Sequence, residues 1–161
     1  MKNNTHISIA LKKVITWARM YNISESIIPS NIDALLNLEI LNLYDLNLNA
    51  LPDELSVLTN LKKLYLASNN FSELPLVVCK LENLEVLWIM NNSIEELPTE
   101  LINLHNLKEL VAFDNNITVL PNLSYIKKLE YLILSNNKLS VLQTTELEKE
   151  FTGKCNLTNQ R

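Results

Sequence analysis

The sequence predicts an α/β solenoid in which short parallel strands alternate with short helical turns. One apolar pattern, clearest from Leu84 to Asn106, also begins at Leu38, Leu61 and Leu107, so that successive copies start 23 residues apart. The prolines keep the same 23-residue spacing: Pro29, Pro52, Pro75, Pro98 and Pro121. Self-similarity at a fixed period of roughly 20 to 29 residues is typical of solenoids, whose repeats stack on one another.

The repeated pattern itself is specific. From Leu84 it reads L-x-x-L-x-L-x-x-N-x-L and continues as x-x-L-P-x-x-L-x-x-L. It resembles the leucine-rich repeat family, and in particular the typical 23-residue Leu-Pro repeats of intracellular bacterial proteins and of Ras-associated eukaryotic proteins. The resemblance covers residues 28–142. It implies a curved solenoid that binds other proteins, and it leaves the identity of the partner open.

Length and composition fit a single domain of this kind. The chain has 161 residues, of which 47% are hydrophobic, and this supplies a continuous core. Its net charge of −4 argues against nucleic acid or an anionic membrane as the main partner, because both are negatively charged. No run of about 18 apolar residues occurs, so the sequence predicts no transmembrane helix.

The cysteines and the N-terminal segment bear on the compartment. The first apolar run is interrupted by Lys12 and Lys13 and does not resemble a secretory signal. Extracellular members of the family usually carry paired cysteines in their end caps, a pairing that Cys79 and Cys155 do not suggest. We therefore expect a cytoplasmic protein, with export as a secreted effector left open.

Residues 1–27 are expected to form an N-terminal helical cap. Between His6 and Tyr21 the apolar residues recur at spacings of four and three, which predicts an amphipathic helix. Asn22 is a plausible stop, because asparagine tolerates the left-handed conformation that follows a helix. We interpret Trp17 as part of the packing of this cap, with an exposed contact as the alternative.

The repeats are expected to span residues 28–142, as half a copy followed by five full copies. The half copy enters at Ile28-Pro29, so the helix replaces its first half and would cover the open core of the first coil. The segments expected to form strands are Glu39–Leu43, Lys62–Leu66, Glu85–Ile89, Lys108–Ala112 and Glu130–Leu134. The residues after each Leu-Pro position are expected to form short helical turns on the convex side, because proline suits a first helical turn.

The turn after most strands carries an asparagine. These residues are Asn69, Asn92, Asn115 and Asn137. A buried carboxamide both donates to and accepts from backbone groups, so stacked copies are expected to form a structural ladder between coils. The first copy has Leu46 at this position, and its turn is expected to be looser.

The C-terminal part departs from the repeat pattern. The fourth copy is one residue shorter than the others, and we interpret the deletion as a tightened loop. Gln143 stands where proline is expected, and residues 143–151 are predicted to form a capping helix with Thr144 or Thr145 as its N-cap. Residues 152–161 are predicted to be a flexible tail.

The sequence offers no recognisable catalytic constellation, so we expect a protein without enzymatic activity. His6 and His105 lie on different elements, and no clustered Cys and His residues suggest a metal site. Gly153 is the only glycine, which excludes a glycine-rich phosphate loop. Cys79 is interpreted as a structural residue. We therefore expect neither a cofactor nor a metal.

The candidate site is the concave face, to which alternation along each strand directs the residues between the leucines. A contiguous apolar and aromatic patch is expected there, composed of Tyr44, Tyr65, Val86, Trp88, Met90, Val111, Phe113, Tyr131 and Ile133. Exposed apolar patches mark interaction sites. The sequence therefore predicts a protein-interaction module that binds a protein or peptide. The alternatives are a homodimer formed through the same face and a regulatory or inhibitory subunit of an enzyme.

Overall fold

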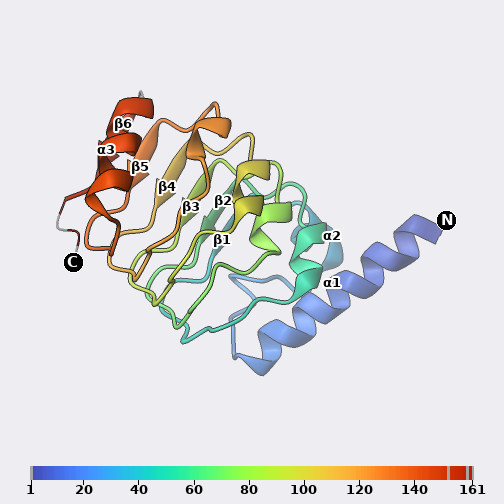
Figure 1. Cartoon of the computed structure of the whole chain (residues 1–161). Helices are drawn as coiled ribbons and strands as arrows, with labels where there is room; N and C mark the ends of the chain where they lie inside the picture. Colours follow the sequence, from blue (N-terminus) through green and yellow to red (C-terminus); the bar gives the residue numbers. More distant parts are fainter. Residues whose placement is uncertain (1, 152, 159, 161) are drawn as a thin grey trace.

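The computed structural model describes residues 2–151, 153–158 and 160, and within them six strands form one parallel sheet. The strands follow one another in the order of the chain, as Figure 1 shows. They are β1 (Ile40–Asn42), β2 (Lys63–Tyr65), β3 (Val86–Trp88), β4 (Glu109–Val111), β5 (Tyr131–Ile133) and β6 (Lys154–Asn156). The predicted solenoid of parallel strands is confirmed.

The register places equivalent repeat positions beside one another. Leu64 of β2 lies opposite Leu41 on one side and Leu87 on the other, and the pairing continues in the same way along the sheet. Each strand has three residues, whereas the five predicted strands had five residues each. The hydrogen bonds nevertheless extend further, since the Leu43 N–H donates to the Tyr65 carbonyl over 2.8 Å.

The leucines that alternate along the strands form the core, as predicted. Leu41, Leu43, Leu87 and Ile89 are all fully buried, and their equivalents in the other copies line up with them. One continuous cluster of apolar side chains therefore runs through every coil. Each repeat contributes an equivalent layer of side chains to this core, because each coil is covered only by its neighbours.

The convex side consists of short 3-10 helices, which confirms the predicted helical turns. They are η1 (Asp53–Val57), η2 (Val78–Lys80), η3 (Thr99–Asn103) and η4 (Leu123–Tyr125). Pro52 and Pro98 directly precede η1 and η3, with φ angles of −70° and −68° that suit entry into a helical turn. The shortened fourth copy contains η4, which has three residues where η1 and η3 have five.

Two helices lie at the N-terminal end of the solenoid. Helix α1 (Lys2–Met20) begins before the predicted start and is followed by Asn22 in the left-handed conformation, with φ of 53°. It packs against η1, and its buried residues Leu11 and Val14 join the common core. The N-terminal half of α1 projects beyond the repeats in Figure 1.

Two further contacts complete this end. Trp17 is half-buried against the core and lies 5.6 Å from the ring of Tyr21, so it belongs to the packing of the cap. The Lys13 ammonium pairs with the Glu54 carboxylate over 2.7 Å and joins α1 to η1. Helix α2 (Ile32–Leu36) then leads into the first strand and buries Leu35.

At the other end, helix α3 (Val141–Glu150) begins two residues before the predicted capping helix. The N-cap is Ser140, not Thr144 or Thr145. The Ser140 hydroxyl accepts a hydrogen bond from the Gln143 backbone N–H, and the Gln143 side chain accepts one from the Ser140 N–H. This reciprocal pair satisfies two donors at the start of the helix, an arrangement that a threonine further along cannot provide.

The expectation of a flexible tail over residues 152–161 is wrong for the segment that forms β6. Lys154–Asn156 pair with β5, and Cys155 lies opposite Leu132. Gln160 takes the place of the turn asparagine, because its Nε2 donates to the Leu134 and Leu157 carbonyls over 2.9 Å each. Residues 152, 159 and 161 of the predicted tail lie outside the described residues.

The single glycine of the chain has a specific place in this end. A Cβ atom at Gly153 would clash with the backbone carbonyl of Glu130, the residue just before β5. The obstacle is backbone rather than the end of a flexible side chain, so it cannot move aside without disturbing the pairing of β5 with β6. Glycine is therefore required for the close approach.

We expect Gly153→Ala to lower the free energy of unfolding by roughly 1–3 kcal/mol, the usual cost of inserting an atom into a packed contact. Urea denaturation followed by circular dichroism measures the change. Lys149→Ala, on an exposed position of α3, serves as the control and should leave the midpoint unchanged. An unchanged midpoint for Gly153→Ala would contradict the close approach of Gly153 to the Glu130 carbonyl.

Candidate protein-interaction surface

Alternate strand residues line up in three columns on the solvent-facing side of the sheet, called the concave face below. The register sets the central column, which runs Asn42, Tyr65, Trp88, Val111, Ile133 and Asn156. A second column at the beginning of the strands runs Ile40, Lys63, Val86, Glu109, Tyr131 and Lys154. The third, just beyond the strands, contains Tyr44, Ala67, Met90, Phe113 and Ser135.

The structure brings the predicted patch residues together on this face, with different exposures. Tyr44 and Tyr131 are 52% and 41% exposed. Six more are half-buried by their neighbours: Tyr65, Val86, Trp88, Met90, Phe113 and Ile133. Val111 is only 5% exposed, because it lies between Trp88 and Ile133 in the central column. A role of these residues in binding remains a prediction.

Trp88 is held from two sides. Its ring lies 4.7 Å from that of Tyr65, centroid to centroid, at an interplanar angle of 57°. Its indole Nε1–H donates to Glu109 Oε1 over 2.7 Å. The tilted Tyr65 ring and the hydrogen bond together fix the orientation of the indole, so its apolar surface is presented in one position.

Glu109 is a site residue that the sequence prediction did not include. It occupies the column at the beginning of the strands, beside Val86 and Tyr131, and it is half-buried. Oε1 accepts the Trp88 bond, whereas Oε2 has no protein partner among the described residues and remains open to solvent. The 23-residue spacing alone predicts that Glu109 and Trp88 lie on adjacent strands of the same face. It does not predict the hydrogen bond between them, because that bond depends on the rotamers of the two side chains.

The turns above the sheet contain the predicted asparagine positions. Asn69 donates from Nδ2 to the Leu43 carbonyl of the preceding coil over 2.7 Å, while its Oδ1 accepts from the Leu46 and Leu48 N–H groups. Asn92, Asn115 and Asn137 each donate to the corresponding carbonyl of the preceding coil and accept from one of its N–H groups, one coil further on each time. Leu46 is accommodated in the first turn because Asn69 satisfies its backbone from the next coil.

The residue before each turn asparagine has a left-handed backbone. This set is Ser68, Asn91, Asp114 and Asn136, with φ angles of 53° to 56°, and Asp45 takes the same role in the first copy. Asparagine and aspartate adopt this conformation more readily than other non-glycine residues. The turns are thus built without glycine.

A second asparagine series lies where the convex turn enters the strand, and the sequence prediction missed it. Asn60, Asn83 and Asn106 each donate from Nδ2 to a carbonyl of the preceding coil, over 2.8–2.9 Å. The signal was present, since the three Asn-Leu pairs are 23 residues apart. The acceptors are the carbonyls of Leu36, Thr59 and Glu82.

Alternating charges flank the start of the strands. Lys62 pairs with Glu39 over 2.9 Å, and Lys108 pairs with Glu85 over 2.7 Å. The hydrogen bond from Lys108 lowers the pKa of Glu85 and raises that of Lys108 itself. These pairs are solvent-exposed and contribute little to stability.

Neither cysteine has the properties of a nucleophile. Burial raises the pKa of Cys79 to about 12, with a contribution from the charge of Glu100. Burial likewise raises the pKa of Cys155 to about 11, with a contribution from Glu148. Both are free thiols, and a thiol that stays protonated neither attacks a substrate nor binds a metal readily.

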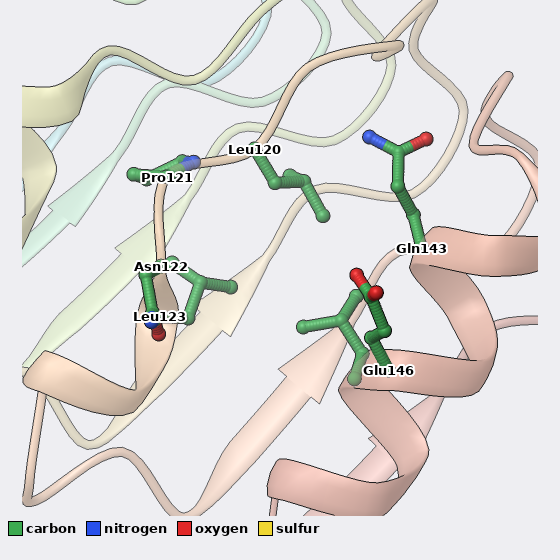
Figure 2. Close-up of a pocket in the computed structure, with 7 residues that line it drawn as sticks. Leu120, Pro121, Asn122, Leu123, Gln143 and Glu146 are labelled. Carbon is green, nitrogen blue, oxygen red and sulfur yellow. The ribbon is translucent and has the colours of Figure 1, made fainter.

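A cavity on the convex side lies between the shortened fourth copy and α3 (Figure 2). It has a volume of about 230 Å³, and Leu120, Pro121 and Leu123 face Gln143 and Glu146 across it. The Gln143 side chain is already engaged, since its Nε2 donates to the Thr118 carbonyl over 2.9 Å. The lining contains no nucleophile and no general acid–base pair.

Within the described part of the chain, no group of three or more His, Cys, Asp or Glu side chains is arranged to hold a metal ion. The same residues contain no helix that is both long enough and apolar enough to cross a membrane.

Stacked coils, leucine columns and asparagine-bonded turns define a leucine-rich repeat solenoid. Residues 11–155 match the family described as a leucine-rich repeat region, and the chain belongs to this family. Among curated proteins, none matches the sequence.

Solved structures extend the comparison. Internalin C2 of Listeria monocytogenes is 29% identical with a TM-score of 0.66, over 79% of this chain and 54% of that one. A leucine-rich repeat protein of Leptospira interrogans is 30% identical with a TM-score of 0.72, over 78% of this chain and 33% of that one. A chain in the BIR3–SERK2 complex of Arabidopsis thaliana is 29% identical with a TM-score of 0.56, over 62% of this chain and 56% of that one.

The chain thus spans about half the length of internalin C2 and a third of the Leptospira protein. The likeness to the bacterial proteins agrees with the resemblance that the 23-residue pattern indicated.

We expect Asn115→Ala to destabilise the fold strongly, because it leaves the buried Ile89 carbonyl and the Ile94 N–H without partners. Each stranded group costs roughly 1–3 kcal/mol. Asn49→Ala is the control, since Asn49 is exposed in the segment that follows the first turn. Guanidinium denaturation compares the two midpoints, and equal midpoints would contradict a structural role for the ladder.

Because burial raises both thiol pKa values, the folded protein should react slowly with a thiol-specific disulfide reagent at pH 8. Cys155, which is half-buried, should react before Cys79. Unfolding in guanidinium should release two fast-reacting thiols. Rapid reaction of Cys79 in the native state would show that its surroundings open easily.

Proposed function

We propose that the chain is a protein-interaction module that binds a protein or peptide segment on its concave face. Leucine-rich repeat domains generally act as protein-interaction modules, and the relative in the BIR3–SERK2 structure is seen in a complex with another protein. The observation that carries the proposal is the cluster around Trp88, where aromatic and aliphatic side chains occupy a sheet face that would otherwise be polar.

The anchor of this surface is Trp88, supported by Tyr65, Met90, Val111 and Phe113. Central aromatic residues dominate the energetics of interfaces, because they are fully desolvated on binding. The orientation of Trp88 is already set by Tyr65 and Glu109 before any partner arrives. Less side-chain freedom is therefore lost on association.

The module is proposed to act without catalysis and in a reducing compartment such as the cytoplasm. Both cysteines are present as free thiols, a state that such a compartment maintains. A regulatory or inhibitory role toward an enzyme is one form that binding on this face can take, and it uses the same residues.

The double substitution Trp88→Ala, Phe113→Ala should abolish binding while the protein stays folded, because both side chains lie outside the leucine core. Truncation of a central anchor costs roughly 2–4 kcal/mol in binding free energy. The measurement uses the full chain to select peptides from a random display library, followed by fluorescence polarisation of the selected peptides with each variant.

Tyr125→Ala is the matched control, because Tyr125 is 60% exposed on η4, away from the concave face. It should bind the selected peptides as the wild type does. Peptides that bind the double variant equally well would overturn the proposed site. Light scattering tests the homodimer alternative: a wild-type dimer that the double substitution makes monomeric would assign the face to self-association.

A further inference from the structure

Glu109 places a single carboxylate inside the apolar part of the concave face. Its neighbours in the same column are Val86 and Tyr131, and its Oε1 is bound to the Trp88 indole at 2.7 Å. Glu109 is half-buried, and its Oε2 is open to solvent without a partner among the described protein groups. A negative charge thus sits beside the proposed binding anchor.

The basic residues of the same column do not neutralise this charge. Lys63 and Lys154 lie two strands away on either side, and neither forms an ion pair with Glu109 within the described residues. Lys154 is placed elsewhere, with its Nζ over the Tyr131 ring, 5.4 Å from the centroid. That contact shows that the Tyr131 ring accepts a cation on its face.

Any partner that covers Trp88 also covers Glu109, because a hydrogen bond of 2.7 Å joins their side chains. Covering removes water from a carboxylate, and burying an unpaired charge is strongly unfavourable. A partner with an apolar surface alone would therefore bind poorly. A partner that brings a cation to Oε2 converts the same carboxylate into a charge-assisted hydrogen bond.

We propose that the partner segment carries an arginine or lysine side chain between apolar residues, and that its cationic group pairs with Glu109 Oε2. The inference rests on the proposed function and specifies the chemistry of its ligand. Trp88 and Tyr131 flank the carboxylate, so the aliphatic stem of the basic residue packs against aromatic rings while its charged end reaches Glu109.

The test selects peptides from a random display library with the wild-type full chain and removes those that also bind Trp88→Ala. We expect a basic residue flanked by apolar residues in the remaining sequences. Glu109→Gln keeps an acceptor for the Trp88 N–H but removes the charge, and it should weaken these peptides at least tenfold. Glu82→Gln removes an equal charge from an exposed turn and should change nothing.

A second selection with Glu109→Lys provides a reciprocal readout. Peptides chosen by this variant should lose the basic residue and gain an acidic one, because the charge they must meet has been reversed. Circular dichroism of each variant separates a binding effect from unfolding. Replacing the arginine or lysine of a selected peptide by norleucine should reduce its affinity for the wild type and leave its affinity for Glu109→Gln unchanged.

The outcomes separate this inference from the proposed function. Trp88-dependent peptides without enrichment in basic residues, or peptides unaffected by Glu109→Gln, would overturn the inference alone. The absence of any Trp88-dependent peptide would overturn the proposed function as well. A wild-type dimer in light scattering that Trp88→Ala makes monomeric would overturn the peptide as occupant of this face.

Discussion

The parallel register of the sheet is the constraint on which the other features depend. Each coil leaves its leucines exposed along two sides, and only the coils on either side cover them, so equivalent positions have to coincide from strand to strand. The fourth copy lacks one residue, yet Glu109 still lies opposite Tyr131. The loss is confined to the convex turn at η4, where no pairing has to be maintained. Length can therefore vary on the convex side and not in the strands.

This register does not restrict which side chains the concave face carries. Alternation directs Leu87 into the core and Trp88 to solvent, so exchanging the second does not disturb the stacking that depends on the first. The backbone of the turns is satisfied separately, by Asn92 and its equivalents. Stability and the proposed recognition thus use different residues of the same short segment.

The periodic part of the fold was predictable because the residue at each structural position is dictated by packing. Leucine spacing predicted the strands and their inward faces, and proline spacing predicted the convex turns. The prediction failed at β6, where Cys155 replaces a leucine and Gln160 replaces an asparagine, although both keep the 23-residue spacing. Cys155 occupies the strand position of a leucine, and the Gln160 side chain makes the backbone hydrogen bonds of a turn asparagine. A search for leucine and asparagine therefore overlooked both residues. A search by position would have found them.

The contact between Trp88 and Glu109 was not predictable from the sequence, because nothing in the repeat pattern requires it. The two residues occupy different columns of adjacent strands, and their bond depends on rotamers that the spacing does not determine. Tyr65 restricts the indole on its other side. The free energy needed to order Trp88 is therefore supplied by folding, and a partner meets a surface whose shape and charge are already set. The same bond ties the proposed apolar anchor to a carboxylate, so the proposed binding face would select among apolar partners by whether they bring a positive charge.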